Sequence, residues 1–190
     1  MRVTLIALVR HGETEWNRLG KVQGHSNIPL NDTGRAQAAG AGEALRGGDY
    51  QVLVASPLDR ANETAKIIGR AVGLEVSAHY DGLKERFYGV AEGMTASDYY
   101  AAFPDRQATN AETLDELTER ALATLREIAE SAGDRDVIAV AHGGLIATVL
   151  RHASGGSLPR EGEYVANCSQ QIVEVAGDDI RVIGYNGTPR

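Results

Sequence analysis

Cysteine is nearly absent from this chain of 190 residues, because Cys168 is the only one. An internal disulfide is therefore excluded, and no spacing of cysteine and histidine resembles a structural zinc site. Long hydrophobic runs are also missing, since no apolar stretch approaches the roughly 20 residues that cross a bilayer. The apolar segment at residues 3–9 lacks a cleavage site and runs straight into Arg10 and His11, so it is not a signal peptide. These absences predict a cytoplasmic protein in a reducing compartment, with no membrane partner.

Positive charge is in short supply as well. Lysine and arginine number 19 against 26 aspartates and glutamates, which gives a formal net charge of -7. A nucleic-acid backbone needs a basic surface, so this balance argues against nucleic acid as a partner. Any cationic site must therefore be local. The length fits a single domain over residues 1–190, and the oligomeric state stays open, with a homodimer as one alternative.

Short β-branched runs alternate with longer alanine-rich stretches along the chain. This order predicts an α/β fold with three layers, α/β/α, in which helices cover both faces of a mostly parallel central sheet. A closing hairpin is predicted around Gly177-Asp178-Asp179, although its place in the sheet stays open. The predicted strands are Leu5–Val9, Val52–Ala55, Glu75–His79, Val137–Ala141, Ile172–Val175 and Ile180–Tyr185.

The helices are indicated by their ends as much as by their interiors. Asn31 is an N-cap candidate for a helix to Arg46, and Ser56-Pro57 reads as the N-cap and first residue of a helix that Gly73 ends. Residues 112–131 carry leucine, alanine and isoleucine at steps of three and four, which predicts one apolar helical face. A last helix, over residues 143–152, directly follows the strand that ends at Ala141.

Three of the predicted strands end in polar residues of the same kind. Arg10 and His11 follow the first strand, Ser56 follows the second with Arg60 one helical turn later, and His142 follows the strand at residues 137–141. In open α/β sheets, ligands bind outside the carboxyl ends of the strands. Two of these positions also begin helices, whose free N–H groups and positive dipole end favour anions. The sequence therefore predicts a phosphate site built from distant segments.

Six sequence blocks together are similar to the histidine phosphatase superfamily, the phosphoglycerate mutase-like proteins, on its phosphatase branch. The blocks are LVRHGETEWN at 8–17; Gln23-Gly24 with Pro29-Leu30 and Gly34; SPLDRA at 56–61 with Thr64-Ala65; LKER at 83–86 with Gly89, Glu92 and Gly93; VAHGG at 140–144; and Asn167-Cys168-Ser169. An Arg-His-Gly triplet alone would be weak support, but six blocks in the family's order span nearly the whole chain.

This resemblance implies phosphoryl transfer through a phosphohistidine at His11. It implies that Glu85 is the acid/base and that Arg10, Arg60 and His142 form the phosphate pocket. The substrate-binding residues it implies are Asn17, Gln23, Gly24, Arg86, Tyr88 and Gly143. The activity that it implies needs no metal and no cofactor, and the ligand that it implies is a small phosphorylated substrate. The residue chemistry agrees, because neighbouring guanidinium groups disfavour the imidazolium and keep a histidine in its nucleophilic neutral form.

The segment after Glu85 bears on whether water or a substrate hydroxyl accepts the phosphoryl group. The block Glu85-Arg86-Phe87-Tyr88-Gly89 resembles the mutase branch, but residues 94–113 are short, contain no lysine and carry Arg106 as their one arginine. Members of the mutase branch carry a longer insert after this block, in which a lysine and a paired arginine hold a small carboxylated, phosphorylated substrate. We therefore expect a phosphomonoester hydrolase, with Tyr99, Tyr100 and Phe103 as an aromatic wall.

Three alternatives stay open at this stage. One is a cofactor-dependent phosphoglycerate mutase, another is a non-catalytic module that binds phosphorylated ligands, and a third is a protein-phosphohistidine phosphatase. Whether residues 94–113 act as a lid is also open. We expect Trp16 to anchor the turn structurally and Cys168 to be buried and inert. The remaining histidines match no block and are expected at the surface or in packing: His25, His79 and His152.

Overall fold

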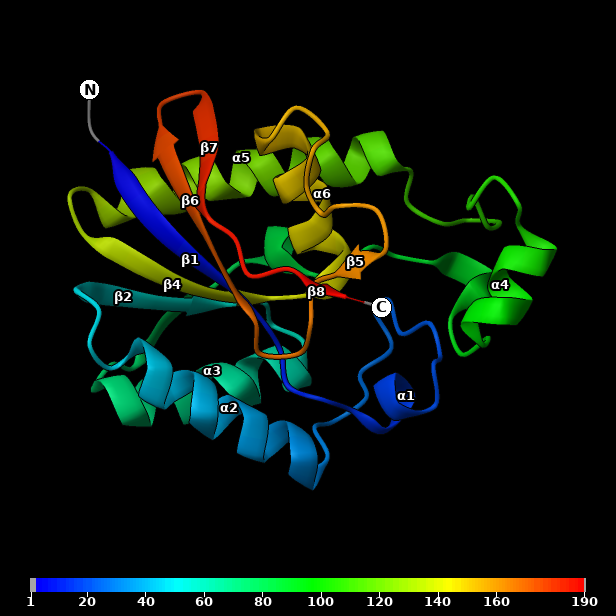
Figure 1. Cartoon of the computed structure of the whole chain (residues 1–190), viewed down its shortest axis with the longest axis horizontal. Helices are drawn as coiled ribbons and strands as arrows, with labels where there is room; N and C mark the ends of the chain where they lie inside the picture. The colour runs from blue at the N-terminus through cyan, green and yellow to red at the C-terminus, as the bar shows by residue number, and fades with distance from the viewer. Residues whose placement is uncertain (1–2, 190) are drawn as a thin grey trace.

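A six-stranded sheet forms the centre of the computed structural model, which describes residues 3–189 (Figure 1). The ends of the predicted 1–190 domain, residues 1–2 and 190, lie outside the described residues. The strand order is β3-β2-β4-β1-β6-β7. The first four are parallel to one another, whereas β6 pairs antiparallel with β1 and β7 pairs antiparallel with β6. The strands are β1 (Thr4–Arg10), β2 (Tyr50–Ala55), β3 (Val76–His79), β4 (Asp136–Ala141), β6 (Gln170–Ala176) and β7 (Asp179–Gly184).

Helices cover both faces of this sheet, which confirms the predicted three-layer α/β fold. Figure 1 shows α2 (Asp32–Leu45) and α3 (Asp59–Val72) on one face, and α5 (Leu114–Ala132) and α6 (Gly143–Ala153) on the other. The hairpin that had no predicted place extends the sheet beyond β1. Its antiparallel pairing leaves the four parallel strands adjacent to one another, so their carboxyl ends meet at one edge.

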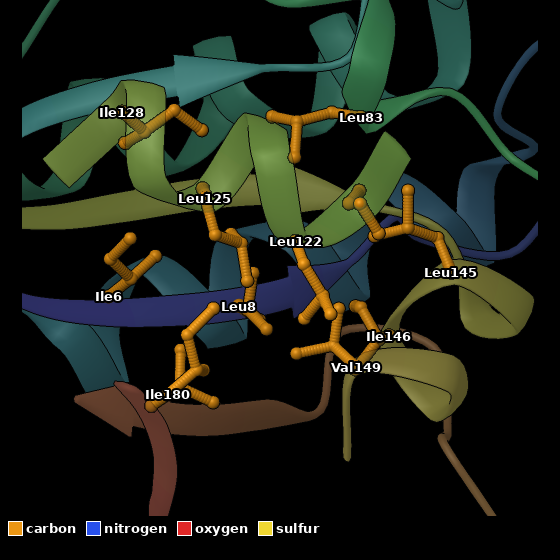
Figure 2. Close-up of a cluster of buried hydrophobic side chains, with 14 of the residues drawn as sticks. Ile6, Leu8, Leu83, Leu122, Leu125, Ile128, Leu145, Ile146, Val149 and Ile180 are labelled. Carbon is orange, nitrogen blue, oxygen red and sulfur yellow. The ribbon is translucent and has the colours of Figure 1, made fainter. Parts of the chain in front are cut away.

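The core follows from alternation along the strands. On β1, the side chains of Ile6 and Leu8 pack with α5 and α6, while those of Ala7 and Val9 pack with α2 and α3. Figure 2 shows the larger cluster, in which aliphatic side chains of α5 and α6 lie against β1. A strand that is buried on both faces needs apolar side chains at every position, and β1 is apolar from Leu5 to Val9. The polar residues Arg10 and His11 come where the strand reaches the edge of the sheet.

The helix ends agree with the sequence except at one point. Asn31 caps α2 by accepting from the Gly34 N–H, and Gly73 ends α3 in a left-handed conformation with φ 76°. The prediction that Ser56 caps α3 was wrong, because that helix begins at Asp59 with Leu58 as its N-cap. The Ser56 hydroxyl instead lies 2.8 Å from Nε2 of His142, so it serves the site rather than the helix end.

Several short elements were not predicted from the sequence. They are α1 (Glu15–Arg18), α4 (Ala96–Ala102), the 3₁₀ turns η1 (Asp81–Leu83) and η2 (Gly89–Ala91), and the two-stranded pair β5 (Glu163–Tyr164) with β8 (Thr188–Pro189). Figure 1 places α1, α4 and β5 around the edge where the parallel strands end. No helix within residues 3–189 combines the length and apolarity needed to cross a membrane.

Candidate active site

The sheet register brings the predicted polar strand ends together. Arg10 is the partner of Ala141 across β1 and β4, and Ala55 is the partner of Val140 across β2 and β4. The chain after each strand continues this pairing, since the His11 N–H donates to the Ala141 carbonyl at 3.0 Å and the Ser56 N–H donates to the Val140 carbonyl at 2.9 Å. His11, Ser56 and His142 therefore lie on three neighbouring strand ends.

His11 is held in one orientation and one tautomer. Its side chain is buried, and Nδ1 lies 2.6 Å from the Gly12 carbonyl, which can only accept, so Nδ1 carries the proton. The other ring nitrogen, Nε2, lies 3.3 Å from Nε–H of Arg60, which donates to it. Nε2 therefore presents a lone pair beside a cation, which is the form that a histidine nucleophile needs.

Burial and charge keep this imidazole neutral. Burial lowers the pKa of His11 well below its usual 6.5, and the neighbouring Arg60 and Arg10 lower it further. The pKa of His142 is lowered in the same way, by burial first and then by Arg60 and His11. Both imidazoles consequently stay unprotonated across the neutral range, while the guanidinium groups remain charged.

These two lowered pKa values predict that stability falls in mild acid. Below pH 6.5 the unfolded chain binds protons at His11 and His142 that the folded chain does not, so the free energy of unfolding decreases by about 1.4 kcal/mol per pH unit for each. The contribution is complete above that pH and is lost as pH falls toward the folded-state pKa values. Urea denaturation at about pH 7.5 and about pH 5.5 measures the difference.

A double variant, His11→Asn with His142→Asn, should lose most of this pH dependence. His152→Asn is the matched control, because His152 is exposed near the end of α6 and should leave the dependence intact. Equal unfolding free energies for the wild type at the two pH values would contradict the account.

Arg60 links His11 to the loop at residues 24–26. Its side chain is fully buried, and its two terminal nitrogens donate to the carbonyls of Ser26 at 2.8 Å and Gly24 at 2.7 Å. Burial lowers the pKa of Arg60 to about 10, with the Glu85 charge opposing the shift, so it stays protonated at neutral pH. Three fixed bonds leave this guanidinium little freedom beside His11.

Two buried nitrogen atoms in the site have no hydrogen-bond partner among the described residues: Nε of Arg10 and Nδ1 of His142. Arg10 is anchored through a terminal nitrogen that donates to the Val165 carbonyl at 2.7 Å. The His142 ring centroid lies 5.2 Å from that of His11, and its Nε2 pairs with the Ser56 hydroxyl. Buried polar atoms are rarely left unpaired, so these two indicate a site that an anion completes.

Glu85 lies at the N-terminus of α6. Its carboxylate oxygens accept from the N–H groups of Gly144 and Leu145, each at 2.9 Å, and from its neighbour Arg86 at 2.8 Å. The positive end of the helix favours a carboxylate at this position. The chain therefore carries a proton acceptor and donor group to the same edge as His11, although the two are 74 residues apart in sequence numbering.

The loop that carries Glu85 is clamped by α5. Arg120 donates to the carbonyls of Gly82 at 2.8 Å and Lys84 at 3.0 Å, and it forms an ion pair with Glu112 at 2.8 Å. A fourth, longer bond reaches the Glu85 carbonyl at 3.4 Å. Arg120 is thus a positioning residue for Glu85, and sequence reasoning did not single it out.

Gly144→Ala is expected to displace the Glu85 carboxylate. A Cβ at Gly144 would lie 2.6 Å from Oε1 of Glu85, closer than real contacts allow. Because small misplacements of a reacting group are costly, we expect kcat to fall about 10- to 100-fold. The control is Gly40→Ala within α2, where a Cβ meets no atom within 4 Å. That variant should keep full activity and gain roughly 0.5–1 kcal/mol of stability. Normal kcat in Gly144→Ala would argue against a fixed role for Glu85.

A cavity of about 810 Å³ opens over this site. Its wall includes Arg10, His11, Arg60 and Glu85, and five of the predicted substrate-binding residues: Asn17, Gln23, Gly24, Tyr88 and Gly143. Tyr99 and Tyr100 also line it, as the expected aromatic wall requires. His142 lies behind this surface and is fully buried.

Two amide side chains in the wall, Asn17 and Gln23, are oriented by hydrogen bonds to their oxygens. Oδ1 of Asn17 accepts from Thr14 and from Asn167, and Oε1 of Gln23 accepts from the Thr14 hydroxyl at 2.7 Å. Neither NH₂ group has a hydrogen-bond partner within residues 3–189 in the structure. Both amides are therefore oriented with their donors unused.

Arg86 and Phe103 do not lie where the sequence analysis placed them. The Arg86 guanidinium is buried and donates to the carbonyls of Glu112 at 2.8 Å and Arg106 at 3.0 Å, and it is absent from the cavity wall. These bonds hold the segment between Arg106 and Glu112 against the loop that carries Arg86. Phe103 packs with Tyr99 in a small cluster and is likewise outside the wall. The expected aromatic wall therefore consists of Tyr88, Tyr99 and Tyr100.

His25 and Glu92 belong to the site, although the sequence indicated no role for them. Nε2 of His25 lies 2.8 Å from the Glu85 carbonyl. The Glu92 carboxylate accepts from the N–H groups of His25 and Ser26, and it occupies the space where a Gly24 Cβ would lie. The left-handed φ of 54° at Gly24 and this close approach explain the glycine. The sequence signal that could have indicated this contact is the Gln23-Gly24 pair together with the distant Gly89-x-x-Glu92.

Cys168 is half-buried rather than buried, which corrects that part of the expectation. Its burial still raises the pKa of the thiol to about 12, in line with an inert thiol. Among residues 3–189, the structure contains no group of three or more histidine, cysteine, aspartate or glutamate side chains arranged to hold a metal ion.

The family is decided by comparison with known proteins. The model of the histidine phosphatase superfamily (branch 1) matches residues 6–188, nearly the whole chain. This chain belongs to the histidine phosphatase superfamily. The resemblance inferred from the six sequence blocks is therefore confirmed, and the site described above lies where those blocks converge.

The relatives of this superfamily member include proteins named as phosphatases and others named as phosphoglycerate mutases. It is 39% identical over 184 residues to "Uncharacterized phosphatase PhoE" of Bacillus subtilis, covering 97% of this chain and 95% of that protein. It is 34% identical over 160 residues to "Metal-independent phosphoserine phosphatase" of Arabidopsis thaliana, covering 77% and 67%. The solved mycobacterial glucosyl-3-phosphoglycerate phosphatase Rv2419c superposes with a TM-score of 0.81 at 27% identity, covering 98% and 100%.

Proposed function

We propose that this chain is a phosphomonoester hydrolase that acts on a small phosphorylated metabolite through a phosphohistidine at His11. The observation that carries the proposal is the state of the His11 ring. Nδ1 is bound to the Gly12 carbonyl, and Nε2 lies beside Nε of Arg60 at 3.3 Å in the wall of the cavity. Nε2 is therefore the unprotonated ring nitrogen, and its lone pair accepts only one long hydrogen bond, from a buried cation at the cavity wall, so it can be turned to attack on phosphorus.

The first step forms a bond from Nε2 of His11 to phosphorus and breaks the bond from phosphorus to the leaving oxygen. Glu85 gives a proton to that oxygen, so the alcohol departs neutral. Arg10 and Arg60 offset charge on the phosphoryl oxygens in transit, and Nδ1 of His142 and Nε of Arg10 are the unpaired atoms available to bind them. Asn17 and Gly143 supply further donors from the wall.

The second step returns the site to its starting state. Water attacks phosphorus and gives its proton to the Glu85 carboxylate, while the bond from phosphorus to Nε2 breaks and restores the His11 lone pair. Water reaches the site readily, because the cavity wall includes exposed residues such as Tyr100 and Arg151. This access supports water as the acceptor over a second substrate hydroxyl, as does the phosphatase name of the relative that is 39% identical over 97% of this chain.

A screen of phosphorylated metabolites with the purified chain tests the proposal. The panel includes 3-phosphoglycerate with and without its bisphosphate, and both free phosphate and isomerised product are measured. We expect release of phosphate without added metal. Isomer formation that depends on the bisphosphate would establish a mutase instead. Binding of phosphorylated ligands with no turnover of any ester would establish a binding module and overturn the proposal.

A further inference from the structure

Glu112 lies behind the loop that carries Glu85, at a point where three parts of the chain meet. It immediately precedes Thr113, the N-cap of α5, and it lies outside the wall of the active-site cavity. Its side chain is 14% exposed. A carboxylate withdrawn from water in this way costs free energy unless charged and polar partners surround it. The partners of Glu112 therefore indicate what this residue does.

The first partner is Arg120, which lies eight positions later, in α5. Nε of Arg120 donates to one carboxylate oxygen of Glu112 and a terminal nitrogen donates to the other, each at 2.8 Å. The remaining N–H groups of this guanidinium reach the carbonyls of Gly82, Lys84 and Glu85 at 2.8, 3.0 and 3.4 Å. All five donors of the arginine are thus used. Two bonds to Glu112 fix the guanidinium plane, and the other three pass its orientation to the loop.

Glu112 also holds the two residues that follow Glu85. Its Oε2 accepts from the Phe87 N–H at 3.2 Å, and its own N–H donates to the Phe87 carbonyl at 2.9 Å. The Glu112 carbonyl accepts from Nε of Arg86 at 2.8 Å. The chain on both sides of Glu85 is therefore tied to Glu112, through Arg120 for the residues before it and directly for the residues after it.

The other end of the Glu85 residue, its carboxylate, is held by α6 through the N–H groups of Gly144 and Leu145. Both α5 and α6 pack against β1 in the same core (Figure 2), so the backbone and the carboxylate of Glu85 are fixed to one body. A group that delivers a proton must stay within hydrogen-bond reach of the leaving oxygen. A misplacement of about 1 Å can cost roughly 10²-fold in rate, so the hold on the backbone matters for the chemistry.

We propose that Glu112 is a positioning residue for proton transfer by Glu85. It fixes Arg120 and the Phe87 backbone, and these hold the loop so that the carboxyl group of Glu85 faces the leaving oxygen. The inference rests on the proposed phosphatase function, in which Glu85 protonates the leaving alcohol. Loss of the Glu112 carboxylate should therefore impair protonation of the leaving group more than it impairs binding of the substrate.

Glu112→Gln tests the inference with two esters that differ in their need for a proton. The amide keeps the shape of the side chain but turns an NH₂ group toward Arg120 or Phe87, which are both donors. For an alkyl phosphate, the rate of phosphohistidine formation should fall about 10- to 100-fold, with KM little changed. For a nitrophenyl phosphate, whose phenol departs without help, it should fall less than about threefold. An unfolded fraction lowers both rates by the same factor, so their ratio reports the acid alone.

Two further variants test whether Glu112 acts through Glu85. Arg120→Lys keeps the positive charge, but one ammonium group cannot reach the carboxylate and three carbonyls at once, so the same dependence on the leaving group should appear. Glu85→Gln combined with Glu112→Gln should be no slower than Glu85→Gln alone, within about twofold, because both changes remove one proton transfer. The matched control is Glu119→Gln, which removes the same charge from the exposed side of α5 and should leave both rates unchanged.

Equal losses for the two esters in Glu112→Gln, or unchanged rates for both, would overturn the inference and leave the phosphatase proposal standing. Losses that multiply in the double variant would overturn it as well, because Glu112 would then act independently of Glu85. Loss of rate without dependence on the leaving group in Glu85→Gln would instead overturn the proton-transfer role of Glu85. Failure of the wild type to release phosphate from any ester would overturn the proposed function itself.

Discussion

Replacement of His11 by alanine is expected to lower kcat by about 10⁴-fold or more, because it removes the nitrogen that we propose as the acceptor of the phosphoryl group. The side chain removed is buried and bonded to Gly12 and Arg60. Arg60 keeps its bonds to the Ser26 and Gly24 carbonyls, and the Gly12 N–H keeps its bond to the Thr64 hydroxyl. The folded state keeps this imidazole neutral, so its removal leaves no buried charge without a partner. The fold should therefore stay intact at neutral pH. Steady-state release of phosphate measures the loss.

Two further variants separate chemistry from folding. His11→Asn retains an amide that can donate to the Gly12 carbonyl, so it should fold like the wild type and remain inactive. His152→Ala removes an exposed histidine from the end of α6 and should keep wild-type kcat. Substantial turnover in a folded His11→Asn variant would show that the nucleophile has been misassigned.

Glu85→Gln is expected to lower kcat by about 10²–10⁴-fold for alkyl phosphates, the range typical of a lost general acid. The substituted amide keeps the shape of the carboxylate but cannot deliver a proton to the leaving oxygen. The loss should depend on the leaving group. An acidic phenol departs without help, so a nitrophenyl phosphate should suffer far less in the first step than an alkyl phosphate.

This dependence distinguishes a chemical role from a structural one. The Glu85 carboxylate also accepts three backbone N–H bonds, and an amide would disturb them equally for every substrate. Rates of phosphohistidine formation for the two esters are therefore compared in one preparation. The control is Glu43→Gln, which affects an exposed pair with Arg46. Equal losses for both leaving groups would reduce Glu85 to a structural residue.

Most of the layer arrangement could be predicted from local sequence signals. Apolar runs such as residues 5–9 and helix ends such as Asn31 and Gly73 depend on a few neighbouring residues, so they can be read without the fold. The position of β6 beside β1 could not, because strand pairing depends on contacts between distant segments. The prediction that Ser56 caps α3 failed for the same reason, since the Ser56 hydroxyl pairs with His142, which lies 86 positions away.

The residues at the strand ends could be predicted from the sequence, but the residues at the rim of the cavity could not. Arg10, His11 and His142 end neighbouring strands, and topology alone brings them together. The direction of Arg86 depends on carbonyls up to 26 positions away, which no local pattern reveals. Arg151 and Arg160 reach the cavity only because α6 and the following segment pass over it. The least predictable part of the cavity is thus the part that distant segments of the chain supply.

The most direct test of the phosphohistidine mechanism is a rapid-quench measurement with an ester labelled in its phosphoryl group. Protein quenched in alkali during turnover is digested, and the labelled peptide is identified by mass spectrometry. We predict an acid-labile phosphate on Nε2 of His11, present within the first turnover and absent in His11→Asn. A burst of leaving alcohol with no phosphate on His11, or with phosphate on another residue, would contradict it.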